Sequence, residues 1–403
     1  MKILILNQHF HPEVAATGQL ATDLAEDLAE NGFAVSVVTG MPSYTRDREL
    51  RKAPLFERYR GVRIYRVITT PFDKNGRVGR VLNYISFSLF ALIRVFTIPR
   101  HDIVITMSTP PFLSLIGVLL KKLRKMKFFY WVQDLYPDIA IAMGVIDERG
   151  FFGRICKKAS QIAYRHADVL VPIGETMAER MKAQGVDEGK LRVIHNWADP
   201  EDFIRTDDGE NPIREKLGLN GKFVVLYSGN IGVVHEFETV KRGMLELKDD
   251  ENLAFLFIGE GVKKKDLVAF VEDNKLQNVH FLPYQPREEL KNSMNAGDAI
   301  LITQNNRSAG LMVPSKIYAA LAVGKPVLAV GPEKSELSEI VQRKSCGIFL
   351  NNGGVEKFVS AIGLLSNNGG LYEASPGNGR ENLITEYSRS AGTGKFQELL
   401  TVL

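Results

Sequence analysis

The chain contains little cysteine and no signal peptide. Its 403 residues include only two cysteines, Cys156 and Cys346, which lie far apart. Without a paired spacing they exclude a disulfide scaffold and a structural zinc site, and they indicate a reducing compartment. The opening MKILILNQHF is typical of a β-strand and lacks the apolar core and cleavage site of a signal peptide. These absences predict a cytoplasmic protein.

Metal-binding and dinucleotide-binding motifs are also missing. The sequence has no Asp-x-Asp pair and no spaced cluster of histidine and aspartate, so no metal site is predicted. The loop after the first expected strand contains one glycine, Gly18, and no G-x-G-x-x-G pattern. A dinucleotide-dependent oxidoreductase is therefore disfavoured.

The composition, 45% hydrophobic and 24% charged, is that of a soluble α/β protein with two or three domains. The net charge of +4 conceals an asymmetry, with about +7 in residues 1–205 and about −3 in the remainder. Most of the basic excess lies between Arg77 and Arg165, where it forms either solvated helix faces or a surface for an anionic membrane. Nucleic acid is a disfavoured partner because no recognised binding motif accompanies the charge.

The most apolar segment is Val81 to Ile98, VLNYISFSLFALIRVFTI. With 18 residues and Arg94 inside, it is too short and too interrupted for a transmembrane span. Two interpretations stay open. The segment is either a core helix or an interfacial helix whose apolar face enters the inner leaflet beside a basic rim, which would make the protein peripheral on the cytoplasmic membrane.

Expected strands and helices alternate along most of the chain, which predicts an α/β fold of two doubly wound, Rossmann-like domains. The first domain is assigned to residues 1–200 and the second to 201–384, with a helix near 385–403 that packs back on the first. Residues 196–221 are interpreted as a linker and residues 367–379 as a loop. Gly392 and Gly394 are expected to interrupt the closing helix. A ligand cleft is expected between the domains, at the carboxyl ends of the strands. The expected strands are 2–7, 34–39, 62–67, 102–107, 128–133, 169–173, 192–195, 223–228, 254–259, 279–282, 299–303, 326–330 and 347–350.

Two turns rich in small residues have the pattern of a diphosphate site. Residues 223–228 form a strand that ends in the turn Gly229–Gly232, and residues 313–328, VPSKIYAALAVGKPVL, begin a helix after another strand. Ser315 is the expected N-cap, and Gly324 marks the helix end. Backbone N–H groups at helix N-termini bind anions, and Lys316 adds an ammonium. The chain is therefore predicted to bind a nucleotide with a phosphoryl leaving group.

These two turns belong to a set of sequence blocks that resemble a known family over nearly the whole chain. From 7–44 to 313–328 the chain resembles the family-four glycosyltransferases of the GT-B fold, especially the bacterial surface-polysaccharide branch. The blocks are NQHFHPEVAATGQLATDLAEDLAENGFAVSVVTGMPSY, STPPF (108–112), YWVQDLYPDIAIAMGV (130–145), VIHNWAD (193–199), YSGNIG (227–232) and VPSKIYAALAVGKPVL.

The resemblance implies a retaining transfer of a sugar from a nucleoside diphosphate without a metal or other cofactor. Asp134 and Lys316 are the implied catalytic residues; Asp134 would orient a sugar hydroxyl or accept the acceptor's proton. An N-cap before Pro137 is the alternative role of Asp134, and a cap on its own turn is the alternative for Lys316. The donor-binding candidates are Gly18, Gly229, Asn230, Gly232, Tyr284, Arg307, Ser315, Lys316 and Glu336. The glycines serve either the ligand or only turn geometry, and His9 and His11 are either phosphate ligands or packing residues.

The chain also departs from the family pattern. The two glutamates usual around the P-S-K turn are replaced by Leu311 and Ala319. Glu336 is the expected substitute for the ribose-binding glutamate. The arginine and lysine usual after the glycine-rich turn are also missing: Asn230 takes the first place and Glu236 lies near the second. Lys316 is therefore expected to carry more of the diphosphate charge.

The leading hypothesis is a transferase for a bacterial cell-surface polysaccharide such as capsule or lipopolysaccharide. Its partners would be a nucleotide-sugar donor, a lipid-diphosphate-linked saccharide acceptor and the anionic inner leaflet. One alternative is a GT-B epimerase or phosphorylase, for which no convincing acid/base set or pyridoxal lysine is evident. Another is an inactive homologue that binds nucleotide sugars or acts as a scaffold, which the missing glutamates favour.

Overall fold

A computed structural model describes residues 1–13, 15–42, 53–70, 72, 77–203, 211–286, 289–373 and 383–402. The chain divides into two compact units. Unit 1 comprises Met1–His195 together with Gly392–Leu403, and unit 2 comprises Asn196–Ala391. The chain therefore passes from one unit to the other near residues 195 and 391. These positions lie a few residues away from the domain limits inferred from the sequence, 200 and 384.

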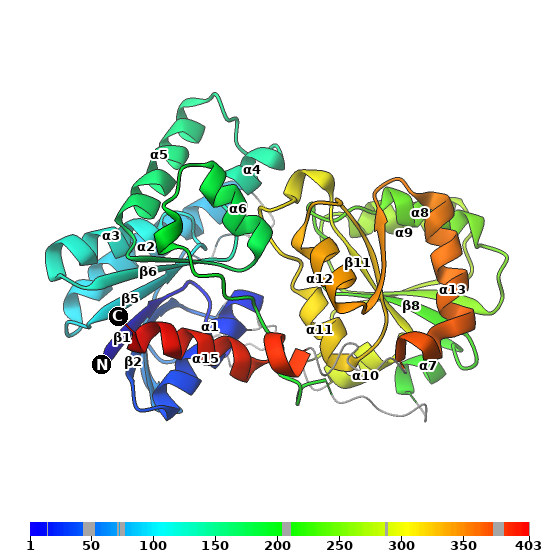
Figure 1. Ribbon diagram of the computed structural model, residues 1–403, viewed down its shortest axis with the longest axis horizontal. Helices are drawn as coiled ribbons and strands as arrows, with labels where there is room; N and C mark the ends of the chain where they lie inside the picture. The colour runs from blue at the N-terminus through cyan, green and yellow to red at the C-terminus, as the bar shows by residue number, and fades with distance from the viewer. Residues whose placement is uncertain are drawn as a thin grey trace. The chain divides into compact units, whose positions relative to one another are not determined.

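Unit 1 is built on a seven-stranded sheet with the order β3-β4-β2-β1-β5-β6-β7 (Figure 1). All neighbouring strands are parallel except β3, an edge strand antiparallel to β4 that the sequence did not predict. The central strands β1, β5 and β6 are buried almost throughout, as expected for a sheet covered on both faces. The strands are β1 (Lys2–Leu6), β2 (Ala34–Gly40), β3 (Phe56–Tyr59), β4 (Val62–Val67), β5 (Ile103–Met107), β6 (Lys127–Val132) and β7 (Val169–Pro172).

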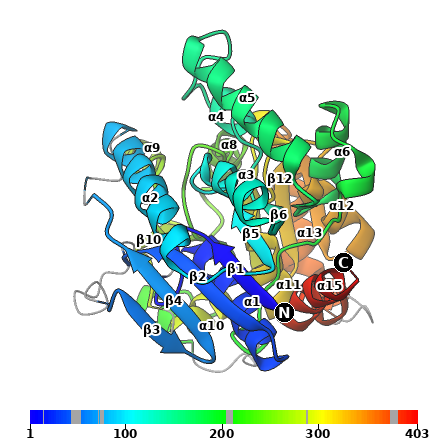
Figure 2. The ribbon, with the colours of Figure 1, turned by 90° about the vertical axis from the view of Figure 1, so that its left-hand side faces the viewer.

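Helices cover both faces of this sheet because right-handed crossovers run in opposite directions from β1 (Figure 2). The helix α1 (Ala16–Glu30) lies on one face, and α2 (Arg77–Thr97), α3 (Leu113–Arg124) and α5 (Phe151–His166) lie on the other. The C-terminal helix α15 (Arg389–Thr401) packs against α1, where Thr393 Oγ1 donates to Asp27 Oδ2 at 2.7 Å. Shorter helices are α4 (Asp138–Ala142), α6 (Glu175–Ala183) and η2 (Glu188–Lys190).

Unit 2 contains a six-stranded parallel sheet with the order β10-β9-β8-β11-β12-β13. Its core consists of residues such as Tyr227, Phe255 and Leu301, buried between the sheet and its helices. The strands are β8 (Phe223–Ser228), β9 (Leu253–Ile258), β10 (Val279–Leu282), β11 (Ala299–Thr303), β12 (Val327–Gly331) and β13 (Gly347–Asn351). The helices are α7 (Pro212–Leu217), α8 (Glu238–Glu246), α9 (Lys264–Asp273), α10 (Leu290–Asn295), η4 (Asn306–Ser308), α11 (Lys316–Val323), α12 (Glu336–Lys344), α13 (Val355–Glu373) and the π-helix η5 (Leu383–Tyr387).

The two Rossmann-like sheets confirm the fold predicted from the sequence, but four local predictions were wrong. Residues 192–195 form no strand; only Leu191 pairs, through an isolated bridge to Leu170. The segment 196–221 contains the helix α7, capped by the Asn211 side chain. The helix α13 continues to Glu373, so residues 367–373 are helical, and the rest of the expected loop to 379 lies outside the described residues. Gly392 and Gly394 do not interrupt α15.

The apolar helix α2 has one buried and one exposed apolar face, so the core-helix interpretation holds for one face and the interfacial interpretation stays a prediction. One face packs on the sheet of unit 1 and buries Asn83, Phe87, Ala91 and Val95. The other face carries large apolar side chains that remain exposed: Val81, Leu82, Ile85, Leu89, Phe90, Ile93 and Phe96. No helix in the described parts of the chain is both long and apolar enough to cross a bilayer.

Candidate functional site

The glycine-rich turn after β8 is hydrogen-bonded to the end of β9 and to the loop that follows it. The N–H groups of Gly229 and Ile231 donate to the carbonyls of Ile258 and Glu260, both at 2.8 Å. A Cβ on Gly259 would lie only 2.0 Å from the Gly229 carbonyl oxygen, so two backbones meet there. Within the described residues, the N–H groups of the turn residues Asn230 and Gly232 donate no hydrogen bond. The turn therefore presents free donors at the carboxyl edge of the sheet.

Lys316, the first residue of α11, reaches across this turn. Its Nζ lies 3.3 Å from the carbonyl oxygen of Asn230 and 4.8 Å from the centre of the Tyr227 ring. Gly229 has φ 126°, and a Cβ there would approach Lys316 Cε to 2.8 Å, so glycine makes room for the lysine. Lys316 does not cap its own turn, and the alternative role considered for it was wrong.

No carboxylate of the described residues pairs with the Lys316 ammonium. Burial lowers the pKa of Lys316 from 10.5 to about 7, because the charged form loses hydration without gaining a counter-ion. A partly buried cation surrounded by neutral groups is attracted to an incoming anion. Together with the free amides of the turn, Lys316 therefore makes this place a candidate anion site.

The N-terminus of α11 adds further donors to this site. Ser315 occupies the N-cap position as predicted, but its hydroxyl makes no capping hydrogen bond. Its side chain is exposed, and the N–H groups of Ser315 and Lys316 have no acceptor in the described part of the chain. Gly324 ends α11 in the left-handed conformation expected from the sequence, with φ 68°.

The remaining donor-binding candidates of unit 2 follow the carboxyl ends of β10, β11 and β12. Arg307, in η4, is exposed and makes no ion pair with the described residues. Tyr284 follows β10, is 44% exposed and lies near enough to contribute, after burial, to the raised pKa of Tyr227. Glu336 is the first residue of α12 and is 3% exposed. Its contact with a ribose stays a prediction.

His235 is a member of this cluster that the sequence did not single out. It follows the turn, is 4% exposed, and its Nε2 lies 3.3 Å from Lys316 Nζ. The only signal for His235 in the sequence is its place shortly after the glycine-rich turn, next to Glu236. The Glu236 side chain instead accepts a hydrogen bond from the Thr239 N–H at the start of α8.

In unit 1, Asp134 is the second residue after β6. Ser108 Oγ accepts hydrogen bonds from the backbone N–H groups of Gln133 and Asp134, at 3.1 and 3.0 Å. The Asp134 carboxylate itself accepts no hydrogen bond from the described residues, so its alternative role as an N-cap was wrong. Burial raises the pKa of Asp134 from 3.8 to about 6. An unpaired carboxylate that titrates near neutrality is suited to accept a proton.

Gly18 and His11, two other candidates near the first loop, make contacts within unit 1, and their part in donor binding stays a prediction. Gly18 lies in the first turn of α1 and not in a loop, because α1 begins at Ala16. Its N–H donates to Ala15, and a Cβ at Gly18 would lie 3.2 Å from His9 Cβ, so the close approach there is intramolecular. His11 stacks on Tyr59 with ring centres 3.8 Å apart, and burial lowers its pKa.

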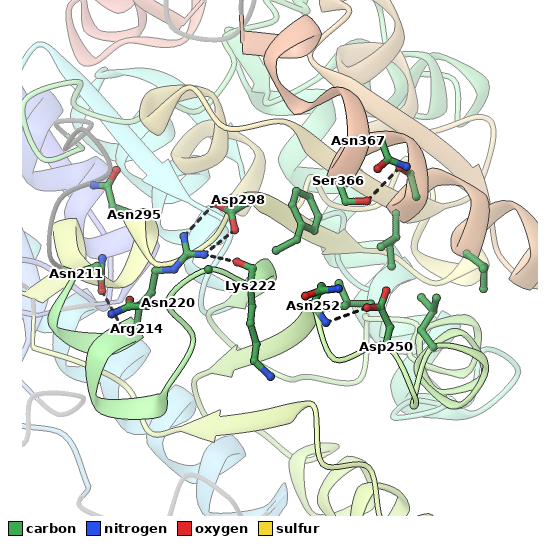
Figure 3. A pocket seen from close by; sticks show the side chains of 17 residues that line it. Asn211, Arg214, Asn220, Lys222, Asp250, Asn252, Asn295, Asp298, Ser366 and Asn367 are labelled. Carbon is green, nitrogen blue, oxygen red and sulfur yellow. Dashed lines mark hydrogen bonds and ion pairs between the residues drawn. The ribbon is translucent and has the colours of Figure 1, made fainter.

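One cavity of unit 2 is separate from the candidate anion site. It has a volume of about 1070 Å³ and lies at the amino-terminal ends of β8, β9 and β11, opposite the edge that carries Lys316. Figure 3 shows Arg214 pointing to Asp298 in its wall, where the two form an ion pair at 3.0 Å. The described residues contain no group of three or more His, Cys, Asp or Glu side chains that could hold a metal ion.

Two doubly wound units with parallel sheets are the architecture of the GT-B fold. Two family models match the chain: Glycosyltransferase Family 4 at residues 17–202 and Glycosyl transferases group 1 at residues 210–382. The chain therefore belongs to the GT-B glycosyltransferases with a family-4 N-terminal domain, as the sequence blocks predicted.

Two relatives are named as glycosyltransferases, and a solved structure has the same fold. The chain is 26% identical over 352 residues to the putative colanic acid biosynthesis glycosyl transferase WcaI of Escherichia coli K12, covering 85% of this chain and 86% of WcaI. It is 28% identical over 248 residues to the probable glycosyltransferase WbjE of Pseudomonas aeruginosa, a match that spans 62% of each protein. Anabaena HepE, solved with UDP and glucose, has a TM-score of 0.75 at 16% identity, with both chains fully covered.

Proposed function

We propose that the chain transfers a sugar from a nucleoside diphosphate to a lipid-diphosphate-linked saccharide, with retention of configuration, during synthesis of a bacterial surface polysaccharide. The observation that carries the proposal is the Lys316 ammonium, which lies beside the turn Gly229–Gly232 without a carboxylate partner among the described residues. The relatives support the pathway, since WcaI is named for colanic acid biosynthesis.

The leaving diphosphate is the group that this site would stabilise. Its negative charge grows as the bond to the sugar breaks, and fixed donors that await that charge lower the barrier. The free N–H groups of Asn230, Gly232 and Ser315 would bind phosphate oxygens, and Lys316 would supply the positive charge. The site would thereby do the work that a magnesium ion does in other transferases, which makes metal independence part of the proposal.

Retention is proposed to follow a front-face route. In this route the acceptor hydroxyl attacks from the side that the diphosphate leaves, and the leaving phosphate takes part in removing its proton. Asp134 would then orient a sugar hydroxyl or take up that proton, which its raised pKa of about 6 allows. Glu336 would bind the ribose in place of the glutamate that is absent at Ala319.

A panel of nucleotide-sugar donors tests the proposed reaction directly. Purified protein is mixed with UDP-, GDP-, dTDP- and ADP-sugars in EDTA, and donor hydrolysis and anomeric configuration are followed by NMR. We expect slow hydrolysis of one nucleotide series, with the configuration of the donor retained in the first product. Inversion, or activity that appears only after magnesium is added, would contradict the mechanism. Binding without turnover of any donor, even with lipid-linked acceptors, would instead indicate a sugar-nucleotide-binding subunit, which the residues Leu311 and Ala319 favour.

A lipid-linked acceptor would require the protein to approach the anionic inner leaflet. The exposed face of α2 supports this part of the proposal, because Ile85, Leu89 and Ile93 follow one another at helical spacing and are each more than half exposed. Phe151 and Phe152, at the start of α5, are 76% and 50% exposed. The helices α2 and α5 cover the same face of the sheet in unit 1.

Several exposed basic side chains accompany these apolar residues. Lys122, Lys125, Arg154 and Lys158 are exposed on α3, at its end and on α5. Not every basic residue of the region is available: Lys121 pairs with Asp168, and Arg124 donates to the carbonyl oxygens of Val95 and Ile98. Apolar insertion beside a basic rim is typical of proteins that lie on anionic membranes.

Flotation with vesicles tests the membrane surface. We expect the protein to float with phosphatidylglycerol vesicles and much less with phosphatidylcholine vesicles. The double change Leu89→Ser and Ile93→Ser should weaken binding at least about tenfold, because two apolar side chains lose their burial in lipid. Leu364→Ser, which alters a similarly exposed leucine of α13 at 53% exposure, is the control. Equal flotation of both variants would show that α2 does not contact the membrane.

A further inference from the structure

The tautomer of His235 follows from its contacts. Its Nδ1 lies 2.7 Å from the carbonyl oxygen of Thr303, the last residue of β11. A carbonyl oxygen only accepts hydrogen bonds, so Nδ1 must carry the proton and donate it. In a neutral imidazole the other nitrogen, Nε2, then holds a lone pair. His235 is thus a fixed acceptor at Nε2 and not a donor.

Lys316 uses this acceptor. Its Nζ lies 3.3 Å from His235 Nε2, 3.3 Å from the carbonyl oxygen of Asn230 and 4.8 Å from the centre of the Tyr227 ring. All three partners are electrically neutral. They accept from the ammonium or face it with π electrons, but none cancels its charge. A carboxylate in the place of the imidazole would hold the lysine equally well, yet it would compete with an anionic ligand.

We propose that His235 is a positioning residue of the diphosphate site, where its Nε2 lone pair directs the Lys316 ammonium to the turn Gly229–Gly232 without neutralising it. This inference rests on the proposed function, since it assumes that the anion is the diphosphate of the donor. It assigns to His235 no contact with the reacting sugar. Its effect on transfer would come entirely through Lys316.

The imidazole is itself fixed from several sides. Tyr227, from β8, packs edge-on against its ring with centres 5.8 Å apart, and Phe237 lies at 6.3 Å. Lys263, from the loop after β9, donates from Nζ to the backbone carbonyl oxygen of His235 at 2.6 Å. Burial, with Lys316 and Lys263 as nearby cations, lowers the pKa of His235 to about 3. The ring therefore stays a neutral acceptor across the range in which Lys316 titrates.

Three variants separate positioning from packing. His235→Leu removes the acceptor, whereas His235→Gln retains a side-chain oxygen that can accept from Lys316. His280→Leu makes the same replacement in β10, at a histidine for which no contact with Lys316 is recorded. Binding of UDP, GDP, dTDP and ADP is measured by isothermal titration calorimetry from pH 6 to 9, and folding is checked by thermal unfolding.

The wild-type protein should bind its preferred nucleotide more weakly as the pH rises through about 7, because the pKa of Lys316 lies there. His235→Leu should weaken binding about tenfold at pH 7, since a hydrogen bond to a charged group is lost. It should also move the decline to lower pH, because the ammonium has lost an acceptor. His235→Gln should restore most of the affinity and the wild-type pH profile, and His280→Leu should change neither.

The outcomes distinguish this inference from the proposed function. If Lys316→Met abolishes binding while His235→Leu binds with wild-type affinity and pH dependence, the positioning role is wrong and the diphosphate site stands. If His235→Leu and His235→Gln are equally impaired with an unshifted profile, His235 is only a packing residue. If no nucleotide binds to the folded wild-type protein, both proposals fail. A 15N spectrum of labelled histidine provides an independent check: protonation of His235 at Nε2 would contradict the inference.

Discussion

Lys316→Met should slow sugar transfer by a factor of about 10²–10³ and at the same time make the protein more stable. Methionine keeps the length of the lysine side chain but removes the charge that we assign to the leaving diphosphate. Loss of one such preorganised group lowers kcat by about 10²–10³-fold in enzymes that stabilise a developing anion. Because the charge grows during the reaction, the loss should appear in kcat as well as in nucleotide affinity.

The gain in stability follows from the lowered pKa of Lys316. This pKa is about 7 in the folded protein, whereas an unperturbed lysine in the unfolded chain has a pKa of 10.5. The unfolded chain binds the proton more tightly, so the free energy of unfolding of the wild-type protein rises between pH 7 and 10.5. Below pH 7 the full cost of the buried ammonium is present. One pKa unit corresponds to about 1.4 kcal/mol, and after allowance for partial exposure we expect Lys316→Met to gain about 2 kcal/mol at pH 7.

Thermal unfolding at pH 7 and pH 10, with and without nucleotide, measures both effects. The variant should melt at a higher temperature than the wild type at pH 7, and this difference should shrink at pH 10. Nucleotide should raise the melting temperature of the wild type alone, since only a protein that binds a ligand is stabilised by it. Lys357→Met, at an exposed lysine of α13, is the matched control. A variant with the turnover of the wild type, or one that melts below the wild type at pH 7, would contradict the assignment of the site.

The strands of both sheets were largely predictable because parallel strands are buried on both faces. Segments such as Ala299–Thr303 are continuous apolar runs bounded by turn residues, and that pattern identifies them without tertiary information. The edge strand β3 lacks the pattern, since its residues alternate between exposed and partly exposed. Helix limits were less predictable: Gly18 suggested a loop, whereas packing of α1 against His9 favours a helix there.

Only those parts of the site that depend on residues close together in the sequence could be predicted. The turn at Gly229 and the lysine at the start of α11 each have a local signature, and the structure brings Lys316 Nζ to the Asn230 carbonyl. The roles of His235 and Gly259 depend on backbone atoms of other strands, Thr303 and Gly229. No pattern within one segment encodes such a contact. For the same reason the unpaired carboxylate of Asp134 became evident only in three dimensions.

Asp134→Asn should likewise combine a large loss of activity with a gain in stability. If Asp134 accepts a proton or orients the acceptor, the amide cannot replace its charge, and kcat should fall by about 10²-fold or more. Activity of the wild type should rise as the pH passes through about 6, where the carboxylate loses its proton. The residual activity of the variant should lack this rise. The pH dependence of kcat/KM, measured with saturating acceptor, tests both expectations.

The stability change has the opposite pH dependence to that of Lys316. The folded-state pKa of Asp134 is raised from 3.8 to about 6, so the folded state binds the proton more tightly. The free energy of unfolding therefore falls as the pH rises from about 4 to 6 and Asp134 loses its proton. Above pH 6 the full cost of the unpaired Asp134 carboxylate is present. At pH 7.5 Asp134→Asn should gain about 1–2 kcal/mol, and at pH 5 less. Asp138→Asn, which alters a carboxylate that accepts a hydrogen bond from Gln184, should show neither effect. Unchanged activity with the same gain in stability would show that the carboxylate is buried without taking part in the reaction.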